Sequence, residues 1–201
     1  MNKSQQDKWD YAAGFYDLLE GFGPERRWRP YKQKLYSKMN GKILFLAVGT
    51  GLDILSFPPD QDITGIDISP KMLEKAQPRV DAYAGNMTTQ QMDVHELEFA
   101  DDSFDQVFTA CTFCSVPDPV KGLIELRRVL KPDGTLNMFE HTGSFTFPFN
   151  VMLNFMNPAV KSIGPEINRN TVANVKAAGF KIEKVSHVFL DIVKTIEAKA
   201  P

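Results

Sequence analysis

A glycine turn follows an apolar run in the first quarter of the chain. The run at residues 42–48 is apolar after its first residue, which predicts a buried parallel strand. The turn contains Gly49 and Gly51, but Ile54 stands where the dinucleotide fingerprint G-x-G-x-x-G needs its third glycine, and the P-loop pattern is absent. Such a turn either holds a nucleotide or is only a tight strand-to-helix connection.

Acidic residues stand at the carboxyl ends of the next two predicted strands, over residues 63–67 and 91–94. Asp67 lies 16 residues past Gly51, where a carboxylate can accept hydrogen bonds from both ribose hydroxyls. It could also cap the next helix, and the two roles are compatible. Asp93 could accept from an adenine amino group. Because no cluster of cationic side chains surrounds the glycine turn, the expected ligand is a nucleoside without a pyrophosphate.

Strands and helices alternate over most of the chain, which predicts a doubly wound α/β domain with its ligand at the carboxyl ends of the strands. The last two strands are too close in sequence for a helical crossover and are expected to pair antiparallel. Besides the three strands above, the pattern predicts helices over residues 69–76, 119–130 and 170–178, and strands over 104–110, 135–139, 181–188 and 192–198.

The composition excludes several classes of protein. The chain has 201 residues and a net charge of −2, which predicts one domain and no nucleic-acid partner. It has no membrane-spanning apolar run, and its first residues lack the apolar core of an export signal, so a cytoplasmic protein is expected. The only cysteines, Cys111 and Cys114, form C-x-x-C without a second ligand pair, so no disulfide framework and no metal site are expected.

Five segments, taken in order, resemble the class I S-adenosylmethionine-dependent methyltransferases. They are Gly49-Thr50-Gly51, residues 65–69 (GIDIS), 92–94 (MDV), 104–107 (FDQV) and 126–134 (LRRVLKPDG). The resemblance implies a Rossmann-like, seven-stranded, mostly parallel sheet with helices on both faces and the last strand antiparallel. It implies one methyltransferase domain, with cap or membrane-facing helices at 1–40, a cofactor-binding core at 41–142, an apolar substrate lid at 143–169 and a final helix and strand pair at 170–201.

The resemblance also implies S-adenosylmethionine as cofactor and a set of contacts to it. Two positions depart from the family: Phe45 stands where an acid usually holds the methionine amino group, and Ala47 stands where the first glycine is expected. Asp53 is our candidate to replace the acid. The expected cofactor residues are Ala47, Gly49, Gly51, Asp53, Asp67, Ile68, Met72, Asp93, Val94 and Cys111.

The N-terminal segment has two notable parts. Residues 9–17 are similar to the helix that folds over the cofactor in the methyltransferases of quinone biosynthesis, which places Tyr16 near the reacting methyl group. Residues 26–38 hold six Lys or Arg and no acid, interleaved with aromatic residues, as suits an anionic membrane surface. A cap helix with a solvated basic face, or contact with RNA, would also account for this pattern.

The segment at residues 144–161 is rich in Phe and Met and has Lys161 as its only charged residue, and it either forms a substrate lid or packs as ordinary helix core. Together with residues 114–119, 139–142 and 164–169, it resembles the bacterial phospholipid N-methyltransferases. That resemblance implies stepwise methylation of phosphatidylethanolamine to phosphatidylcholine, and peripheral association with the inner face of the cell membrane. The alternatives are a thiol or quinone-precursor methyltransferase, or a non-catalytic cofactor-binding membrane module.

Methylation of an amine needs a base, because an alkylammonium with a pKa of about 10 has no lone pair. His141, at the end of the fifth strand, is expected to be that base, although a histidine at a loop start often only bonds to backbone. Tyr16 and Tyr11 are expected to hold the methylated cation. The lipid phosphate is expected to bind Arg29, Lys32 and Arg169.

Overall fold

The computed structural model describes residues 3–20, 23–161 and 165–201, and its centre is a seven-stranded sheet in the order β3-β2-β1-β4-β5-β7-β6. β7 is antiparallel to both of its neighbours, and the other neighbouring pairs are parallel. This confirms the predicted sheet. The strands are β1 (Lys42–Leu46), β2 (Asp62–Asp67), β3 (Asn86–Gln91), β4 (Phe104–Ala110), β5 (Leu130–His141), β6 (Lys181–Phe189) and β7 (Val193–Lys199).

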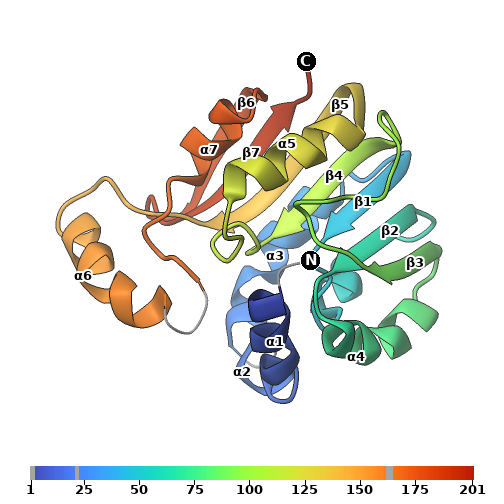
Figure 1. Cartoon of the computed structure of the whole chain (residues 1–201), viewed down its shortest axis with the longest axis horizontal. Helices are drawn as coiled ribbons and strands as arrows, with labels where there is room; N and C mark the ends of the chain where they lie inside the picture. Colours follow the sequence, from blue (N-terminus) through green and yellow to red (C-terminus); the bar gives the residue numbers. More distant parts are fainter. Residues whose placement is uncertain (1–2, 21–22, 162–164) are drawn as a thin grey trace.

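Helices cover both faces of the sheet (Figure 1). α5 and α7 pack on one face, whereas α3 and α4 pack on the other. α6 projects sideways from the body of the molecule, at one end of its long axis (Figure 1). The helices are α1 (Lys3–Ala12), α2 (Tyr16–Glu20), α3 (Pro24–Tyr36), the short 3-10 helix η1 (Leu52–Ser56), α4 (Pro70–Asp81), α5 (Pro119–Val129), α6 (Phe149–Lys161) and α7 (Thr171–Ala177).

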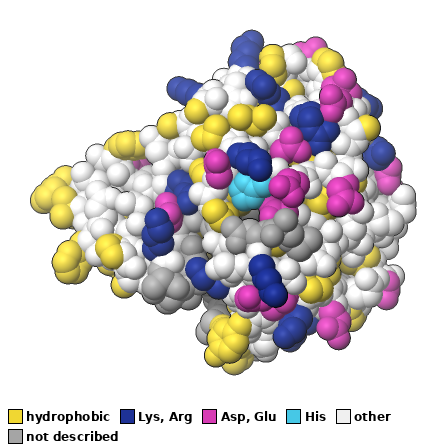
Figure 2. All heavy atoms as spheres, viewed as in Figure 1, with side chains coloured by type: hydrophobic (Ala, Val, Ile, Leu, Met, Phe, Trp, Pro, Cys, Tyr) yellow, Lys and Arg dark blue, Asp and Glu magenta, His cyan; other side chains and the backbone are white. Residues whose placement is uncertain are grey.

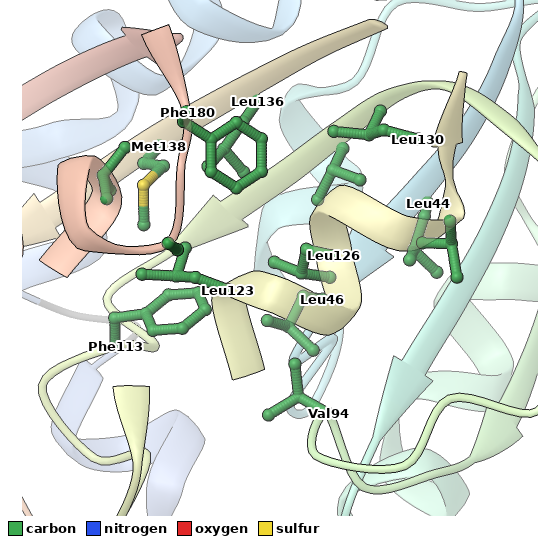
Figure 3. Packing of buried hydrophobic residues seen from close by; sticks show 14 of the residues in the cluster. Leu44, Leu46, Val94, Phe113, Leu123, Leu126, Leu130, Leu136, Met138 and Phe180 are labelled. Atoms are coloured by element: carbon green, nitrogen blue, oxygen red, sulfur yellow. The ribbon is translucent and has the colours of Figure 1, made fainter. Parts of the chain in front are cut away.

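The apolar run of β1 supplies both hydrophobic cores. Leu44 and Leu46 point to the α5 side, where they join Leu123 and Leu126 (Figure 3). Ile43 and Phe45 point to the opposite side. A strand buried on both faces needs apolar residues at every position, and this accounts for the continuous run in the sequence.

Local signals set the helix starts. The Ser69 hydroxyl accepts a hydrogen bond from Met72 N (3.1 Å) at the start of α4, and Asp118 accepts from Lys121 N (3.0 Å) at the start of α5. Such caps satisfy amide donors that have no partner inside the helix. The two caps aim the amino ends of α4 and α5 at the carboxyl edge of the sheet.

The structure corrects two predicted elements. The third strand is Asn86–Gln91, not residues 91–94, so Asp93 lies in the loop beyond the strand. Its sequence, NMTTQQ, is polar because it is a half-exposed edge strand, and this removed the apolar signal. The single helix expected over residues 9–17 is instead broken into α1 and α2. Gly164 of the 164–169 motif lies outside the described residues.

Candidate functional site

A cavity opens at the carboxyl ends of β1, β2 and β4, where the sheet order reverses. Its open volume, mouth and adjoining solvent included, is about 770 Å³. It brings together nine of the predicted site residues: Tyr16, Ala47, Gly49, Asp67, Ile68, Met72, Asp93, Val94 and Cys111.

The glycine turn has left-handed backbone at alternate positions. Ala47, Gly49 and Gly51 have φ values of 58°, 57° and 84°. A Cβ added at Gly49 would meet no described atom within 4 Å, so this glycine borders open space. At Gly51 it would lie 3.2 Å from Ala76 Cβ, and Gly51 lines neither this cavity nor the second one among the described residues. Gly51 therefore permits the turn to pack on α4.

Asp67 is the buried acid at the base of this cavity. Its two oxygens accept hydrogen bonds from Gly49 N (2.8 Å) and Ser69 N (2.9 Å). Burial raises the pKa of Asp67 to about 6, against the lowering effect of these amide donors. Each oxygen keeps acceptor capacity toward the cavity, which fits the paired hydroxyls of a ribose.

The apolar side chains of Ile68 and Met72 lie beside Asp67, and Asp93 lines the same cavity. Asp93 Oδ1 contacts His95 at its amide (3.0 Å) and at its ring Nδ1 (2.7 Å), and His95 Nε2 lies 3.0 Å from the Asp118 carbonyl. His95 also lines the cavity and was missed by the sequence analysis. Its position two residues after Asp93 is the sequence feature that could have identified it as a site residue.

A second cavity adjoins the first beneath α3. It encloses about 580 Å³ with its mouth, and α3 contributes Glu25, Trp28 and Lys32 to its wall. The two cavities share five lining residues, Tyr16, Ala47, Gly49, Ala110 and Cys111. The arrangement therefore has one compartment suited to a nucleoside and a neighbouring compartment for a second molecule.

A buried ion-pair network forms one side of the second cavity. Lys32 Nζ lies 2.7 Å from Glu25 Oε2 and 3.0 Å from Asp53 Oδ1, and the Tyr36 hydroxyl donates to Asp53 Oδ1 at 2.8 Å. Burial alone would lower the pKa of Lys32, but the carboxylates of Asp53 and Glu25 outweigh it and raise the pKa. Lys32 is thus a fixed ammonium, and Asp53 already has two donors on one oxygen. Phe45, which stands where the family usually has an acid, is a buried residue of the hydrophobic core.

The other predicted substrate residues do not converge on the cavities. Tyr11 is 78% exposed and packs edge-on against Phe15. Arg29 lies 3.7 Å from Glu25. Arg169 donates to the carbonyls of Phe113 and Val116 and pairs with Glu166, so its guanidinium holds the loop after β4. Among the described residues none of these three lines either cavity.

His141 lies at the end of β5, and it too is absent from the described lining of both cavities. Burial lowers its pKa. The adjacent Glu140 is fully buried and accepts from Thr109 Oγ1 (2.7 Å), Thr112 N (3.2 Å) and Phe113 N (3.1 Å). Burial raises the pKa of Glu140 to about 7. Glu140 therefore fixes the loop that carries the lining residue Thr112.

The N-terminal helices close over the first cavity through polar contacts. Asp10 of α1 accepts from Ser69 Oγ at the start of α4. Asp17 of α2 accepts from Thr50 Oγ1 and from Arg79 Nη2 (2.8 Å), and Arg79 Nη1 also donates to the Thr50 carbonyl (2.6 Å). These contacts hold the lining residues of α1 and α2 over the glycine turn.

Within residues 3–20, 23–161 and 165–201, no helix combines the length and apolarity needed to cross a bilayer. The same ranges contain no group of three or more His, Cys, Asp or Glu side chains placed to hold a metal ion.

Known proteins resemble this chain in sequence and in fold. Residues 44–138 match the family described as "Methyltransferase domain". The ubiquinone/menaquinone biosynthesis C-methyltransferase UbiE of Geotalea daltonii is 39% identical over 145 residues, 67% of this chain and 62% of that protein. The UbiE of Geotalea uraniireducens is 34% identical over 161 residues, 75% of this chain and 68% of that protein. The chain thus spans somewhat under two thirds of the first of these relatives.

Among solved structures, a possible histamine N-methyltransferase of Thermotoga maritima superposes with a TM-score of 0.70. The match covers 96% of this chain and all of that one, at 20% identity. At this identity the likeness shows the shared fold alone.

The prediction of phosphatidylethanolamine N-methylation, and with it a place in phosphatidylcholine synthesis, is wrong. The curated relatives at 34% and 39% identity are carbon methyltransferases of quinone synthesis. The error came from the apolar and basic segments at residues 144–161 and 26–38, which indicate lipophilic surroundings but do not identify the methyl acceptor.

The cavity at the carboxyl edge, with its buried Asp67, and the methyltransferase family match agree on the cofactor, which is S-adenosylmethionine. The sheet order, the acid after β2 and the match over residues 44–138 are those of one enzyme family. The chain belongs to the class I S-adenosylmethionine-dependent methyltransferases.

Proposed function

We propose that this enzyme methylates a ring carbon of a hydroxylated aromatic quinone precursor. The observation that carries the proposal is the identity of 39% and 34% with two quinone C-methyltransferases over two thirds or more of this chain. The second cavity supports it, because Trp28 and Tyr16 offer aromatic walls beside a buried cation.

Residues of the first cavity would hold the cofactor. Asp67 would accept from its ribose hydroxyls, while Ile68 and Met72 would pack against its adenine. When bound, S-adenosylmethionine supplies a methyl group on a sulfonium, an electrophile that needs no further activation. The protein then has to make the acceptor nucleophilic and position it, and positioning alone contributes up to about 7–11 kcal/mol.

Lys32 is the residue best placed to activate such an acceptor. A ring carbon beside a hydroxyl becomes nucleophilic when the hydroxyl loses its proton, and the ring proton leaves after the new carbon–carbon bond has formed. The Lys32 ammonium would stabilise the oxyanion, because fixed charge in a buried site acts strongly on developing charge. The carboxylates of Glu25 and Asp53 line the same cavity and would accept the protons.

The proposal is tested with S-adenosylmethionine labelled in its methyl group and a short-chain prenylated naphthohydroquinone as acceptor. We expect one labelled product whose NMR spectrum shows a new methyl group on a ring carbon. A small thiol serves as the competing acceptor. Labelling of the thiol alone, or of neither compound when cofactor binding has been verified, would refute the proposal.

Variants of α3 test the role of Lys32. Lys32→Met should lower kcat by about 10²–10³ while cofactor affinity stays unchanged, and Lys32→Arg should recover part of the loss. Lys34→Met is the matched control, because Lys34 is exposed on the same helix. Removal of Lys32 also leaves two carboxylates without their cation, so folding is checked by circular dichroism. Equal kcat in the Lys32→Met and Lys34→Met variants would exclude the role.

A further inference from the structure

α6 exposes an apolar stripe. Val151, Met152, Phe155 and Met156 follow the i, i+1, i+4, i+5 spacing of one helix face, and all four are exposed, Phe155 at 86%. The opposite side of the helix carries Leu153, which is buried in the core on the α3 side of the sheet. In Figure 2, hydrophobic side chains gather at the end of the molecule where α6 lies. The helix therefore presents its apolar residues outward as well as inward.

The loop before α6 extends this surface. Phe145 and Phe147 are 72% and 78% exposed. Asp191, in the turn between β6 and β7, holds the loop: it accepts from Ser144 Oγ (2.6 Å) and Phe145 N (2.7 Å). The two phenylalanines are thus displayed on a fixed loop. We call Phe145, Phe147, Val151, Met152, Phe155 and Met156 the apolar tip.

Positive charge lies next to the apolar tip. Phe189, at the end of β6 beside the Asp191 turn, packs against Trp28 of α3 (6.1 Å between ring centroids), and the Arg27 guanidinium lies 4.6 Å from each ring. Residues 24–36 and 144–161 together contain six Lys or Arg and one acid, Glu25, although the whole chain has a net charge of −2. Lys161 is paired with Glu166, and Asp191 is occupied by its hydrogen bonds to the loop, so the positive charge of this surface comes from the exposed cations of α3, which are Arg26, Arg27 and Lys34. Glu25 is buried and paired with Lys32. The surface thus combines exposed aromatic residues with local positive charge.

We propose that the apolar tip, with Arg27 beside it, docks on the surface of an anionic lipid bilayer. Aromatic and aliphatic side chains on one helix face, flanked by cations, suit the boundary between headgroups and acyl chains. A second copy of the chain is a poorer occupant, because a symmetric contact would bring the cationic margins of both copies together. The proposal concerns docking and holds whether or not the ring-carbon activity is correct.

Vesicle co-sedimentation without cofactor tests the docking. Wild-type protein should bind vesicles of equal parts phosphatidylglycerol and phosphatidylcholine, and should bind less as salt is added. The Phe147→Ser/Phe155→Ser double variant should lower the partition coefficient by at least about tenfold, because it removes two large exposed apolar groups. Arg27→Gln should weaken binding to the anionic vesicles and leave the weak binding to pure phosphatidylcholine unchanged.

Ile124→Ser is the matched control, because Ile124 is a partly exposed apolar residue of α5, on the opposite face of the sheet. It should bind like wild type. The proposal would be overturned if wild-type protein did not bind anionic vesicles, or if the double variant bound them as well as wild type does. A concentration-dependent dimer that the double variant abolishes would also overturn it, since the tip would then be covered by a second copy. Methylation of a short-chain acceptor without vesicles should be equal in all variants, which separates failure of docking from failure of the proposed chemistry.

Discussion

Ala47 adopts a left-handed backbone, with φ of 58°, where β1 leads into the glycine turn. For an L residue this conformation costs about 1–2 kcal/mol relative to the right-handed region, whereas glycine adopts it freely. The sequence shows only that alanine replaces an expected glycine, which suggests a question of size. The structure shows that backbone conformation is what the family's glycine satisfies at this position.

We therefore expect Ala47→Gly to raise the free energy of unfolding by about 0.5–1 kcal/mol, measured by urea denaturation. Gly49→Ala is the matched reverse change, because Gly49 has nearly the same φ and a Cβ there meets no described atom within 4 Å. It should destabilise the protein by a similar amount. A stability loss in Ala47→Gly would show that the strain is not stored at this residue.

Asp67 predicts a pH dependence of cofactor binding. Its pKa of about 6 lies above its ordinary value of 3.8, and only the carboxylate can accept from both ribose hydroxyls. Affinity for S-adenosylmethionine should therefore fall as the pH drops through 6, by about tenfold at pH 5. Isothermal titration calorimetry between pH 7.5 and 5 measures this. Asp67→Asn should bind weakly at every pH, and a wild-type affinity constant over this range would contradict the assignment.

The raised pKa of Asp67 also makes folding stability depend on pH, in the direction opposite to cofactor affinity. Between pH 3.8 and about 6 the folded protein binds more protons at Asp67 than the unfolded chain does. The contribution of this residue to the free energy of unfolding is therefore greatest below pH 3.8 and is lost as the pH rises through 6. The buried site favours a proton that cofactor binding must displace.

At the level of elements, the cap formed by α1 and α2 is tied to the glycine turn and to α4 by polar contacts. Arg79 of α4 joins Asp17 of α2 to the Thr50 carbonyl in the glycine turn. Burial tends to raise the pKa of Asp17, but the hydrogen bonds from Thr50 and Arg79 lower it, so this carboxylate stays ionised. Arg79 thus connects the cap to the cofactor cavity.

Arg79→Met should loosen the cap, because it removes both hydrogen bonds and the charge while keeping much of the side-chain volume. We expect faster hydrogen exchange in residues 3–20 and a several-fold faster release of S-adenosylmethionine, measured by stopped flow, with global stability nearly unchanged. Lys176→Met is the control, because Lys176 is exposed on α7, on the other face of the sheet. Unchanged release from Arg79→Met would show that the cap closes without this link.

The elements were predicted where a physical signal was local. A continuous apolar run marked β1, and a serine cap marked the start of α4. The polar edge strand β3 gave no such signal. The ion-pair network of Lys32 could not be predicted either, because it joins α3 to η1 through a tertiary contact. From the sequence, Lys32 was predicted to bind a lipid phosphate. Position after a strand was enough to single out Asp67 and Asp93.

At the scale of the molecule, one sheet separates two cores, and both tryptophans lie in the N-terminal helices. Leu126 belongs to the core under α5, whereas Trp28 packs against the core on the other face. If the sheet makes the two cores one cooperative unit, Leu126→Ala should lower the free energy of unfolding by about 2–5 kcal/mol by fluorescence and by circular dichroism alike. A fluorescence midpoint that stays in place while the circular dichroism midpoint moves would show that the two faces unfold separately.

The substrate was the least predictable property of the whole molecule. The sheet and the cofactor follow from local motifs such as the glycine turn and Asp67, whereas the proposed acceptor would be selected by side chains around the second cavity. A largely apolar segment such as residues 144–161 indicates contact with an apolar molecule or a lipid surface. It says nothing about which atom receives the methyl group.

The two cavities share the wall at Ala47 and Gly49, but different pieces of the chain cover them: α1 borders the first and α3 the second. If the acceptor binds in the second cavity as proposed, donor and acceptor would be covered by different helices, and neither would have to pass the other to reach its site. For steady-state kinetics this means random loading, in which neither substrate waits for the other to leave. Intersecting double-reciprocal plots, with product inhibition that is competitive only toward the matching substrate, are the expected signature.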